Sequence, residues 1–377
     1  MKSHWMMYLG FLFVWVIFHA AFLSQNGEEA WGEFFGQWFP PYLAVLVGIG
    51  LGLASRSVRQ STFRFYLLAV LAAPSVLYLL MSLWVSMQSG HWAIGYWGIT
   101  DHKMSLVFYA DLLAALACAK LLDDLQSRDA GIKRYIWILC IVLAFYVAIL
   151  SDSLNGILLT GVCTLLMLVV IAYRFREKLS RAAIVIAVFS LATASIYAVS
   201  SSPSFATHWK KLVNNTSVAV DIDTYPNWRN FSKQGLPKNS QGVQVPESLY
   251  LRVAYATAGL RTVIEHPWGY GVTRRAFERL VQQKYPDVAI ANSHNGYIDL
   301  VCAVGFPALL LLVMVIASVY KQLSQSSSEW ARPAAWMIGV IVVHWAIDPI
   351  SRDHYFETFL FMVGLLATLT FKGATEN

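Results

Sequence analysis

A histidine in a short polar run is the first residue of this sequence that could do chemistry. His294 lies in the run Asn292-Ser-His-Asn-Gly-Tyr297, directly before a long apolar segment. A histidine side chain changes charge near neutral pH, so an imidazole here could act as a general base. It could equally anchor a helix where lipid meets water, and the sequence leaves both interpretations open. Gly296 and Asp299, which enter the apolar segment, strengthen the first.

A polar stretch over about 201–293 is rich in basic side chains. They are Lys210, Lys211, Arg229, Lys233, Lys238, Arg252, Arg261, Arg274, Arg275, Arg279 and Lys284. Only six acids accompany them, so the stretch suits an anionic ligand such as a phosphate or pyrophosphate. A solvated face, or contact with anionic lipid headgroups, explains a single lysine equally well. Arg252 is the strongest candidate, because it begins an apolar helical stripe. Arg261, Arg274 and Arg275 are further candidates for substrate binding.

The composition decides what kind of molecule must position these residues. The chain has 377 residues, of which 57% are hydrophobic and only 13% are charged. Soluble domains carry about a quarter charged residues. A soluble enzyme, a disordered protein and a nucleic-acid-binding domain are therefore excluded, and the net charge of +6 does not indicate a nucleic-acid partner. The four cysteines lie in apolar runs without metal-ligand spacing and are expected to be buried.

Apolar segments predict an all-α polytopic membrane protein with about ten transmembrane helices. A helix needs about 20 apolar residues to cross the hydrocarbon core. Ten segments come close: 5–24, 39–55, 65–87, 104–122, 135–151, 156–173, 182–200, 296–320, 333–347 and 355–371. The first has no clear cleavage site, so we expect it to be a membrane helix rather than a removed signal peptide. Asp111 is the clearest ionisable residue inside a predicted helix, and such residues are functional candidates.

Basic residues in the short loops predict the orientation. They follow the second, fourth, sixth, eighth and tenth segments, whereas the intervening short loops hold only Lys103 and Arg352. Cytoplasmic loops carry an excess of Lys and Arg, so both termini are expected in the cytoplasm and 201–293 outside. The chain thus divides into helices one to seven (1–200), an outer loop domain (201–293) that supplies binding residues, and helices eight to ten (294–377).

The outer domain has two parts. Residues 203–247 are rich in Asn, Ser, Pro and Gly and predict an irregular loop. Residues 247–264 predict a helix, because Leu249, Val253, Ala256, Leu260 and Val263 recur close to helical spacing. His266-Pro267 ends this helix, and a second short helix is expected at 274–284. Asp221 and Asp223 give only a weak metal-binding pattern, and no P-loop, dinucleotide fingerprint or nucleophile elbow is present.

Three features resemble the O-antigen ligase family. His294, ten intervening residues and Gly305 reproduce the family's His-x10-Gly motif. The segment Leu251-Arg-Val-Ala-Tyr, continued by Arg261 and ending in Glu265-His-Pro-Trp-Gly-Tyr-Gly271, is similar to the family's arginine-bearing helix and its Pro-aromatic-Gly turn. The large outer loop directly before the motif is the third. The detailed match covers about 250–310.

The resemblance implies both a fold and an activity. It implies a helix bundle resembling class C glycosyltransferases, in the bacterial inner membrane among membrane lipids, with the active site facing the periplasm. The donor would be a glycan on undecaprenyl pyrophosphate, and the acceptor the lipid A-core oligosaccharide. Catalysis would need no metal and no cofactor. Arg252 would be the pyrophosphate-binding arginine and His294 the catalytic histidine.

One position departs from the family pattern. The family has a second arginine where a short periplasmic turn enters a helix, and Asn155 takes that place in Ser151-Asp-Ser-Leu-Asn155. Lys103 is the best substitute cation, and Arg352 is the second. The family also more often has twelve helices than ten.

The residues themselves agree with glycosyl transfer from a lipid pyrophosphate. Arginine offers a fixed fork of donors for phosphate oxygens, and a histidine at the lipid–water boundary is placed to deprotonate an acceptor hydroxyl. No side chain stands out as a covalent nucleophile, so inversion at the anomeric carbon is expected. An O-antigen polymerase using the same donor remains an alternative. A glycolipid transporter is another, although the matching broken helices of transporters are not found.

Overall fold

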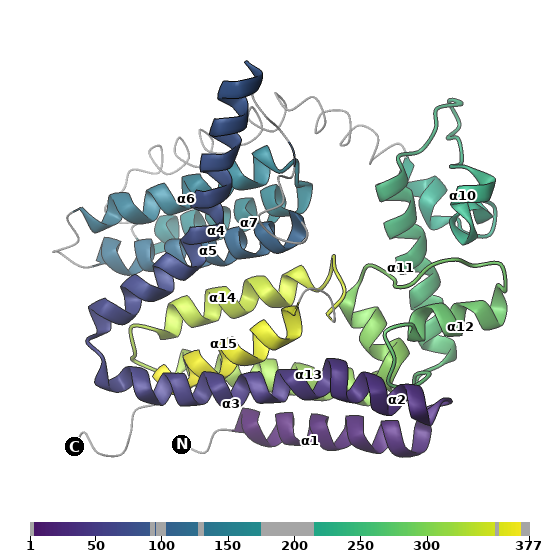
Figure 1. Cartoon of the computed structure of the whole chain (residues 1–377), viewed down its shortest axis with the longest axis horizontal. Helices are drawn as coiled ribbons and strands as arrows, with labels where there is room; N and C mark the ends of the chain where they lie inside the picture. The colour runs from purple at the N-terminus through teal and green to yellow at the C-terminus, as the bar shows by residue number, and fades with distance from the viewer. Residues whose placement is uncertain are drawn as a thin grey trace. The chain divides into compact units, whose positions relative to one another are not determined.

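The computed structural model describes residues 4–90, 95, 103–126, 132–174, 215–350 and 354–370 (Figure 1). The seventh predicted membrane segment, 182–200, lies outside these residues, as does Arg352.

Helices make up nearly all of the regular structure. The described residues are 79% helical and contain no β-strand. The N-terminal helices are α1 (His4–Phe18), the π-helical turn η1 (His19–Leu23), α2 (Gly27–Glu33), the π-helical turn η2 (Phe34–Trp38), α3 (Phe39–Ala54) and α4 (Gln60–Ser89). They are followed by α5 (Lys103–Gln126), α6 (Lys133–Leu150) and α7 (Leu154–Arg174). The later helices include α11 (Glu247–Glu265), α12 (Ala276–Lys284), α13 (Gly296–Ser324), α14 (Ala331–His344) and α15 (Tyr355–Leu369).

The prediction of an all-α, multi-pass membrane protein is confirmed. Within the described residues, seven helical stretches are long and apolar enough to span a membrane, and α14 and α15 are shorter apolar helices. Together these nine elements correspond to nine of the ten predicted segments. Their outward faces carry large apolar side chains, as lipid contact requires: Phe65, Val70 and Leu77 of α4 are all exposed.

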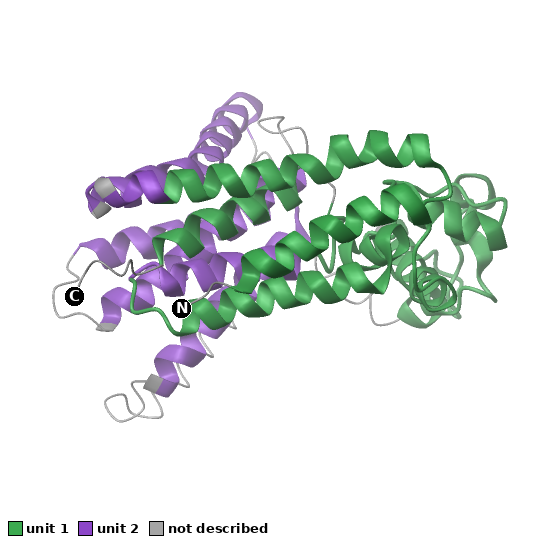
Figure 2. Cartoon of the chain, turned by 90° about the horizontal axis from the view of Figure 1, so that it is seen from below, with its two compact units in different colours: residues 1–52, 208–328, 345–377 green, residues 53–207, 329–344 purple. Residues whose placement is uncertain are grey.

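The chain folds into two compact units, each built from segments that are distant in the sequence (Figure 2). Unit 1 comprises Met1–Gly52, His208–Ser328 and Trp345–Asn377, and unit 2 comprises Leu53–Thr207 and Glu329–His344. Unit 1 therefore takes residues from each of the three predicted divisions of the sequence.

Unit 2 is organised around α5. This helix packs against α4, α6, α7 and α14, and 89% of its most apolar stretch is buried inside the protein. Tyr78, Leu106, Ala110 and Val147 belong to its core. Asp111, on the same helix, is buried, and one of its carboxylate oxygens accepts a hydrogen bond from Thr160 at 2.8 Å. A hydroxyl partner of this kind reduces the cost of placing a carboxyl group inside a helix bundle.

Unit 1 contains two close helix pairs. The helix α13 packs along α1 (Figure 1). The helix α15 lies against α3, where glycines remove the side chains that would hold the two backbones apart. A Cβ on Gly48 would lie 2.3 Å from the carbonyl oxygen of Phe361, and one on Gly364 would lie 2.4 Å from that of Val45. Small residues at such contacts let membrane helices approach closely.

Candidate functional site

His294 occupies a sharp turn whose backbone is held from several sides. Its φ angle is 56°, a left-handed conformation that costs a non-glycine residue about 1–3 kcal/mol. Asn295 caps the following helix, because its side-chain oxygen accepts hydrogen bonds from the amides of Tyr297 and Ile298, both at 3.1 Å. Asp299 accepts one from the amide of Ser293 at 2.9 Å. These bonds offset the strain and leave the imidazole on a rigid support.

A second segment locks the same turn from the C-terminal part of the chain. The amide of Gly296 donates to the carbonyl of Trp345 at 2.7 Å, and the side-chain amide of Asn295 donates to that of Ala346 at 3.0 Å. A Cβ on Gly296 would lie 2.6 Å from Ile350, so glycine is required for this approach. The polar run around His294 thus serves to fix one histidine at the entrance of α13.

The helix α11 brings a second functional candidate to His294. The ring of Tyr255, on α11, stacks on the imidazole with centroids 6.0 Å apart and planes 8° apart. Arg252 lies three residues earlier on α11, and side chains three apart share one helix face, with Cβ atoms about 5–6 Å apart. Arg252 is therefore one helical turn from the ring that contacts His294. The two strongest sequence candidates converge within unit 1.

Tyr255 itself was missed as a functional candidate by the sequence reasoning. The sequence contained a signal for it. Tyr255 follows Arg252 by three residues, so in a helix the two side chains share one face. The ring is 4% exposed, and burial raises the pKa of its hydroxyl above the usual range. Tyr255 therefore remains a neutral phenol and contributes shape and stacking rather than charge.

The observed α11 confirms the predicted helix over 247–264 but buries a different face. The buried positions include Leu251, Ala254, Tyr255 and Ala258, whereas Leu260 of the predicted stripe is exposed. A Cβ on Gly259 would lie 2.5 Å from Ile298, which shows how closely α11 approaches α13. The predicted second helix at 274–284 is observed as α12, beginning two residues later.

Gly305, the last residue of the His-x10-Gly motif, breaks α13. Its φ is 78°, and an added Cβ would lie 2.8 Å from the carbonyl carbon and oxygen of Trp268. The break leaves backbone carbonyls of α13 without a hydrogen bond inside the helix, and amides from another segment donate to them instead. Tyr270 and Gly271 donate their amides to the carbonyls of Cys302 and Ala303, at 2.7 and 3.0 Å. The glycine that ends the His-x10-Gly motif therefore packs directly against the Pro-aromatic-Gly turn at 267–271.

The first helix braces this contact. The indole of Trp15 donates to the carbonyl of Val304 at 2.8 Å, and the imidazole of His19 lies 2.7 Å from the carbonyl oxygen of Trp268. The hydroxyl of Ser24 accepts a hydrogen bond from the amide of Val272 at 3.1 Å. Residues near the start of the chain thus fix the turn at 267–272.

Three of the predicted substrate-binding arginines form ion pairs. Arg261 pairs with Asp223 at 2.8 Å, Arg274 with Glu33 at 3.1 Å and Arg275 with Glu278 at 2.5 Å. The hydrogen bond that Arg261 donates to the carboxylate of Asp223 raises the pKa of Arg261. Lys284 likewise binds Glu265 at 2.7 Å, and this bond lowers the pKa of that carboxyl. Much of the positive charge is therefore compensated locally, and the roles of these arginines as ligands stay predictions.

Lys103 contacts the turn of unit 2 that precedes Asn155. The ammonium of Lys103 donates to the carbonyl oxygen of Asp152 at 3.4 Å, in the turn that leads to Asn155 on α7. A Cβ on Gly156 would lie 2.6 Å from Val107, so this turn packs tightly against the start of α5. The lysine is thus placed beside the position where Asn155 stands for the family arginine. Its proposed role as substitute cation stays a prediction.

Comparison with known proteins adds one finding. The family model described as O-antigen ligase matches residues 139–313. The matched stretch includes Asn155, Arg252, His294 and the Gly305 break, and it excludes Lys103. No curated protein matched the chain.

Proposed function

We propose that this chain is an O-antigen ligase. The family model described as O-antigen ligase matches residues 139–313, and members of that family carry out glycosyl transfer in lipopolysaccharide biosynthesis. In this proposal it transfers a glycan from undecaprenyl pyrophosphate to the lipid A-core oligosaccharide. The reaction takes place at the periplasmic face of the bacterial inner membrane.

The observation that carries the proposal is the contact between α11 and the His294 turn. Arg252, whose guanidinium suits a phosphate, lies one helical turn from Tyr255. The ring of Tyr255 stacks on the imidazole of His294, which is suited to accept a proton. Transfer from a lipid pyrophosphate needs both groups, because a proton must leave the acceptor while negative charge develops on the leaving group.

The proposed step is a direct displacement. His294 takes the proton of an acceptor hydroxyl, and that oxygen forms a bond to the anomeric carbon of the donor. The bond between this carbon and the phosphate oxygen breaks, and the pair of electrons leaves with undecaprenyl pyrophosphate. Arg252 binds the phosphate oxygens and stabilises that charge. One displacement inverts the configuration at the anomeric carbon.

The rigid support of His294 fits this role. General bases act only within hydrogen-bond reach of the proton that they abstract, so an imidazole held by a capped and doubly anchored turn is suited to the task. A surface anchor would gain nothing from the left-handed backbone observed there.

Deletion of the gene tests the proposal against polymerase activity. Loss of the ligase is expected to leave lipid-linked polymer in the membrane while polymer on lipid A-core disappears. Complementation with the wild-type chain restores the capped lipopolysaccharide, and His294→Ala does not. Single repeat units attached to lipid A-core in the deletion strain would instead identify a polymerase.

A further inference from the structure

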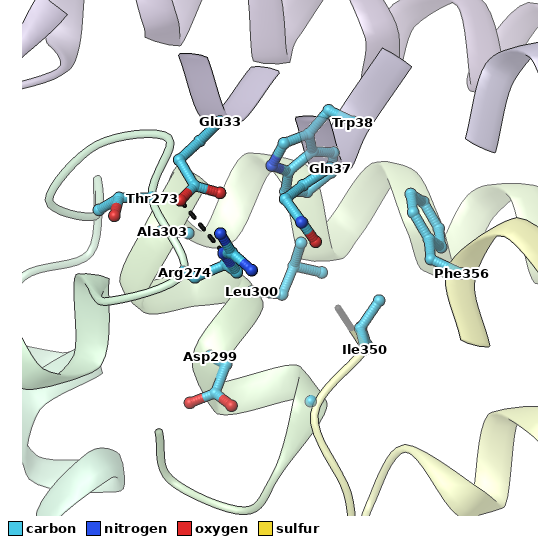
Figure 3. Close-up of a pocket in the computed structure, with 11 residues that line it drawn as sticks. Glu33, Gln37, Trp38, Thr273, Arg274, Asp299, Leu300, Ala303, Ile350 and Phe356 are labelled. Atoms are coloured by element: carbon cyan, nitrogen blue, oxygen red, sulfur yellow. Dashed lines mark hydrogen bonds and ion pairs between the residues drawn. The ribbon is translucent and has the colours of Figure 1, made fainter. Parts of the chain in front are cut away.

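Unit 1 contains a pocket of about 50 Å³ beside the first turns of α13 (Figure 3). Its lining comes from the end of α2 and from η2 (Glu33, Gln37 and Trp38), from the loop before α12 (Thr273 and Arg274), and from α13. Ile350 and Phe356 close the side formed by the C-terminal segment. The volume holds a few water molecules, or one edge of a larger ligand that extends outward.

Polar groups from distant parts of the sequence converge in this pocket. Figure 3 shows the carboxylate of Glu33 directed toward Arg274 and the side-chain amide of Gln37 extending from η2 into the pocket. One carboxylate oxygen of Glu33 pairs with Arg274, whereas the other is buried and has no hydrogen-bond partner among the described residues. A buried carboxylate oxygen without a partner is costly, so a ligand that donates a hydrogen bond is favoured there.

The charge of the pocket argues against a pyrophosphate ligand. The carboxylate of Glu33 offsets the guanidinium of Arg274, and a second acid, Asp299, lines the pocket from α13. The formal charge is thus not positive. Carboxylate and amide groups bind hydroxyls well, and the indole of Trp38, packed edge-on against Phe356 at 5.7 Å, provides an apolar wall. A neutral sugar carries hydroxyl groups around an apolar ring face, and this combination matches the polar and apolar walls of the pocket.

The pocket shares its wall with the His294 turn. Gly296 lines the pocket two residues after His294, and Asp299 lines it while its carboxylate holds the amide of Ser293. Arg252 and Tyr255 reach the turn from α11, and neither of them lines the pocket. The first turn of α13 therefore lies between the face that suits a phosphate and a pocket that suits hydroxyls.

We propose that this pocket, formed by Glu33, Gln37, Trp38 and Arg274 beside the first turn of α13, binds a neutral sugar ring of the acceptor. The inference rests on the proposed function for the identity of the acceptor. The acceptor is assigned rather than the donor glycan because the general base must meet the acceptor hydroxyl, and the pocket adjoins the turn that carries the base.

Gln37→Ala is the variant of choice. Gln37 is half-buried and forms no hydrogen bond within the described chain, so its removal leaves no protein group unpaired. The loss of one hydrogen bond to a sugar hydroxyl is expected to weaken acceptor binding by about two- to tenfold. Glu33→Gln, which keeps the shape but removes the charge, should weaken it similarly. The matched control is Glu265→Gln, which breaks an exposed ion pair of the same unit away from the pocket.

Two readouts test the assignment separately. The first is binding of lipid-free core oligosaccharide to the purified full chain in detergent, measured by calorimetry with and without excess inorganic pyrophosphate. We expect wild-type protein and Glu265→Gln to bind alike, Gln37→Ala and Glu33→Gln to bind more weakly, and pyrophosphate not to compete. The second is transfer kinetics, in which Gln37→Ala should raise the KM for acceptor and leave the KM for lipid-linked donor unchanged.

The outcomes are distinguishable from failure of the ligase assignment. If the chain binds the oligosaccharide through Gln37 and Glu33 but transfers nothing to it, the pocket stands and the proposed function fails. Wild-type affinity in both variants, competition by pyrophosphate, or a raised donor KM in Gln37→Ala would each overturn the pocket assignment.

Discussion

The ring of Tyr255 lies parallel to the imidazole of His294, with planes 8° apart and centroids separated by 6.0 Å. Tyr255 belongs to α11 and His294 to the turn before α13, so this one contact joins the helix that carries Arg252 to the polar run that carries the histidine. An offset parallel arrangement is the geometry that aromatic rings favour. The stack therefore sets the plane of the imidazole.

Replacing Tyr255 tests the importance of that plane. Tyr255→Leu should lower kcat by about two- to tenfold, the energy range of an aromatic pair, because the imidazole loses its support. Tyr255→Phe keeps the ring and should retain most activity. The transfer assay with purified protein gives both values, and equal activity in the leucine and phenylalanine variants would show that stacking has no part in catalysis.

Arg252 should respond to substitution as a bidentate phosphate ligand. We expect Arg252→Ala to abolish transfer and Arg252→Lys to rescue it poorly, because an ammonium is a point charge that cannot reproduce the planar fork. Donor KM and kcat, measured at matched amounts of folded protein, check the claim. Near-normal transfer by Arg252→Ala would refute the pyrophosphate role.

Gly305→Ala should destabilise the protein. The added Cβ would meet the backbone of Trp268 at 2.8 Å, and the φ of 78° is strained for alanine, so a loss of about 1–3 kcal/mol is expected. The measurement is the thermal unfolding midpoint of purified protein. Gly161→Ala on α7 is the matched control: nothing lies within 4 Å of its added Cβ, and alanine favours a helix, so its midpoint should not fall.

Topology can be measured at Lys238, which is exposed in the outer loop domain. The positive-inside pattern predicts that Lys238→Cys in intact cells reacts with a membrane-impermeant thiol reagent that reaches the periplasm. The four native cysteines are buried, which keeps the background low. Labelling that requires a permeabilised inner membrane would place the domain in the cytoplasm and remove the premise of a periplasmic site.

Sequence and structure agree where the signal is local. Nine of the ten apolar segments correspond to a helix among the described residues, and the spacing within 247–264 predicts α11. The motifs also named Arg252 and His294 as candidates, because each motif is a short run of neighbouring residues; their roles stay predictions.

What escaped prediction depends on contacts between distant segments. The fit of Gly305 against Trp268 involves two turns that no local pattern connects. The partner of Arg274 is Glu33, 241 residues earlier in the chain, and a count of charges over 201–293 could not include it. The pocket at Glu33 and Gln37 was missed for the same reason, since three of its eleven lining residues come from the first 40 residues and the others follow residue 270.

The central claim is that His294 is the general base, and its most direct test is turnover by His294→Ala. The assay uses purified protein, lipid-linked glycan and lipid A-core, normalised to the folded, monodisperse fraction. A lost general base should lower the rate by about a hundredfold or more, with folding and donor binding preserved. His294→Gln should be equally poor, and wild-type activity should fall as the pH drops through the range in which an imidazole takes up a proton. Wild-type turnover per folded molecule in His294→Ala would contradict the account.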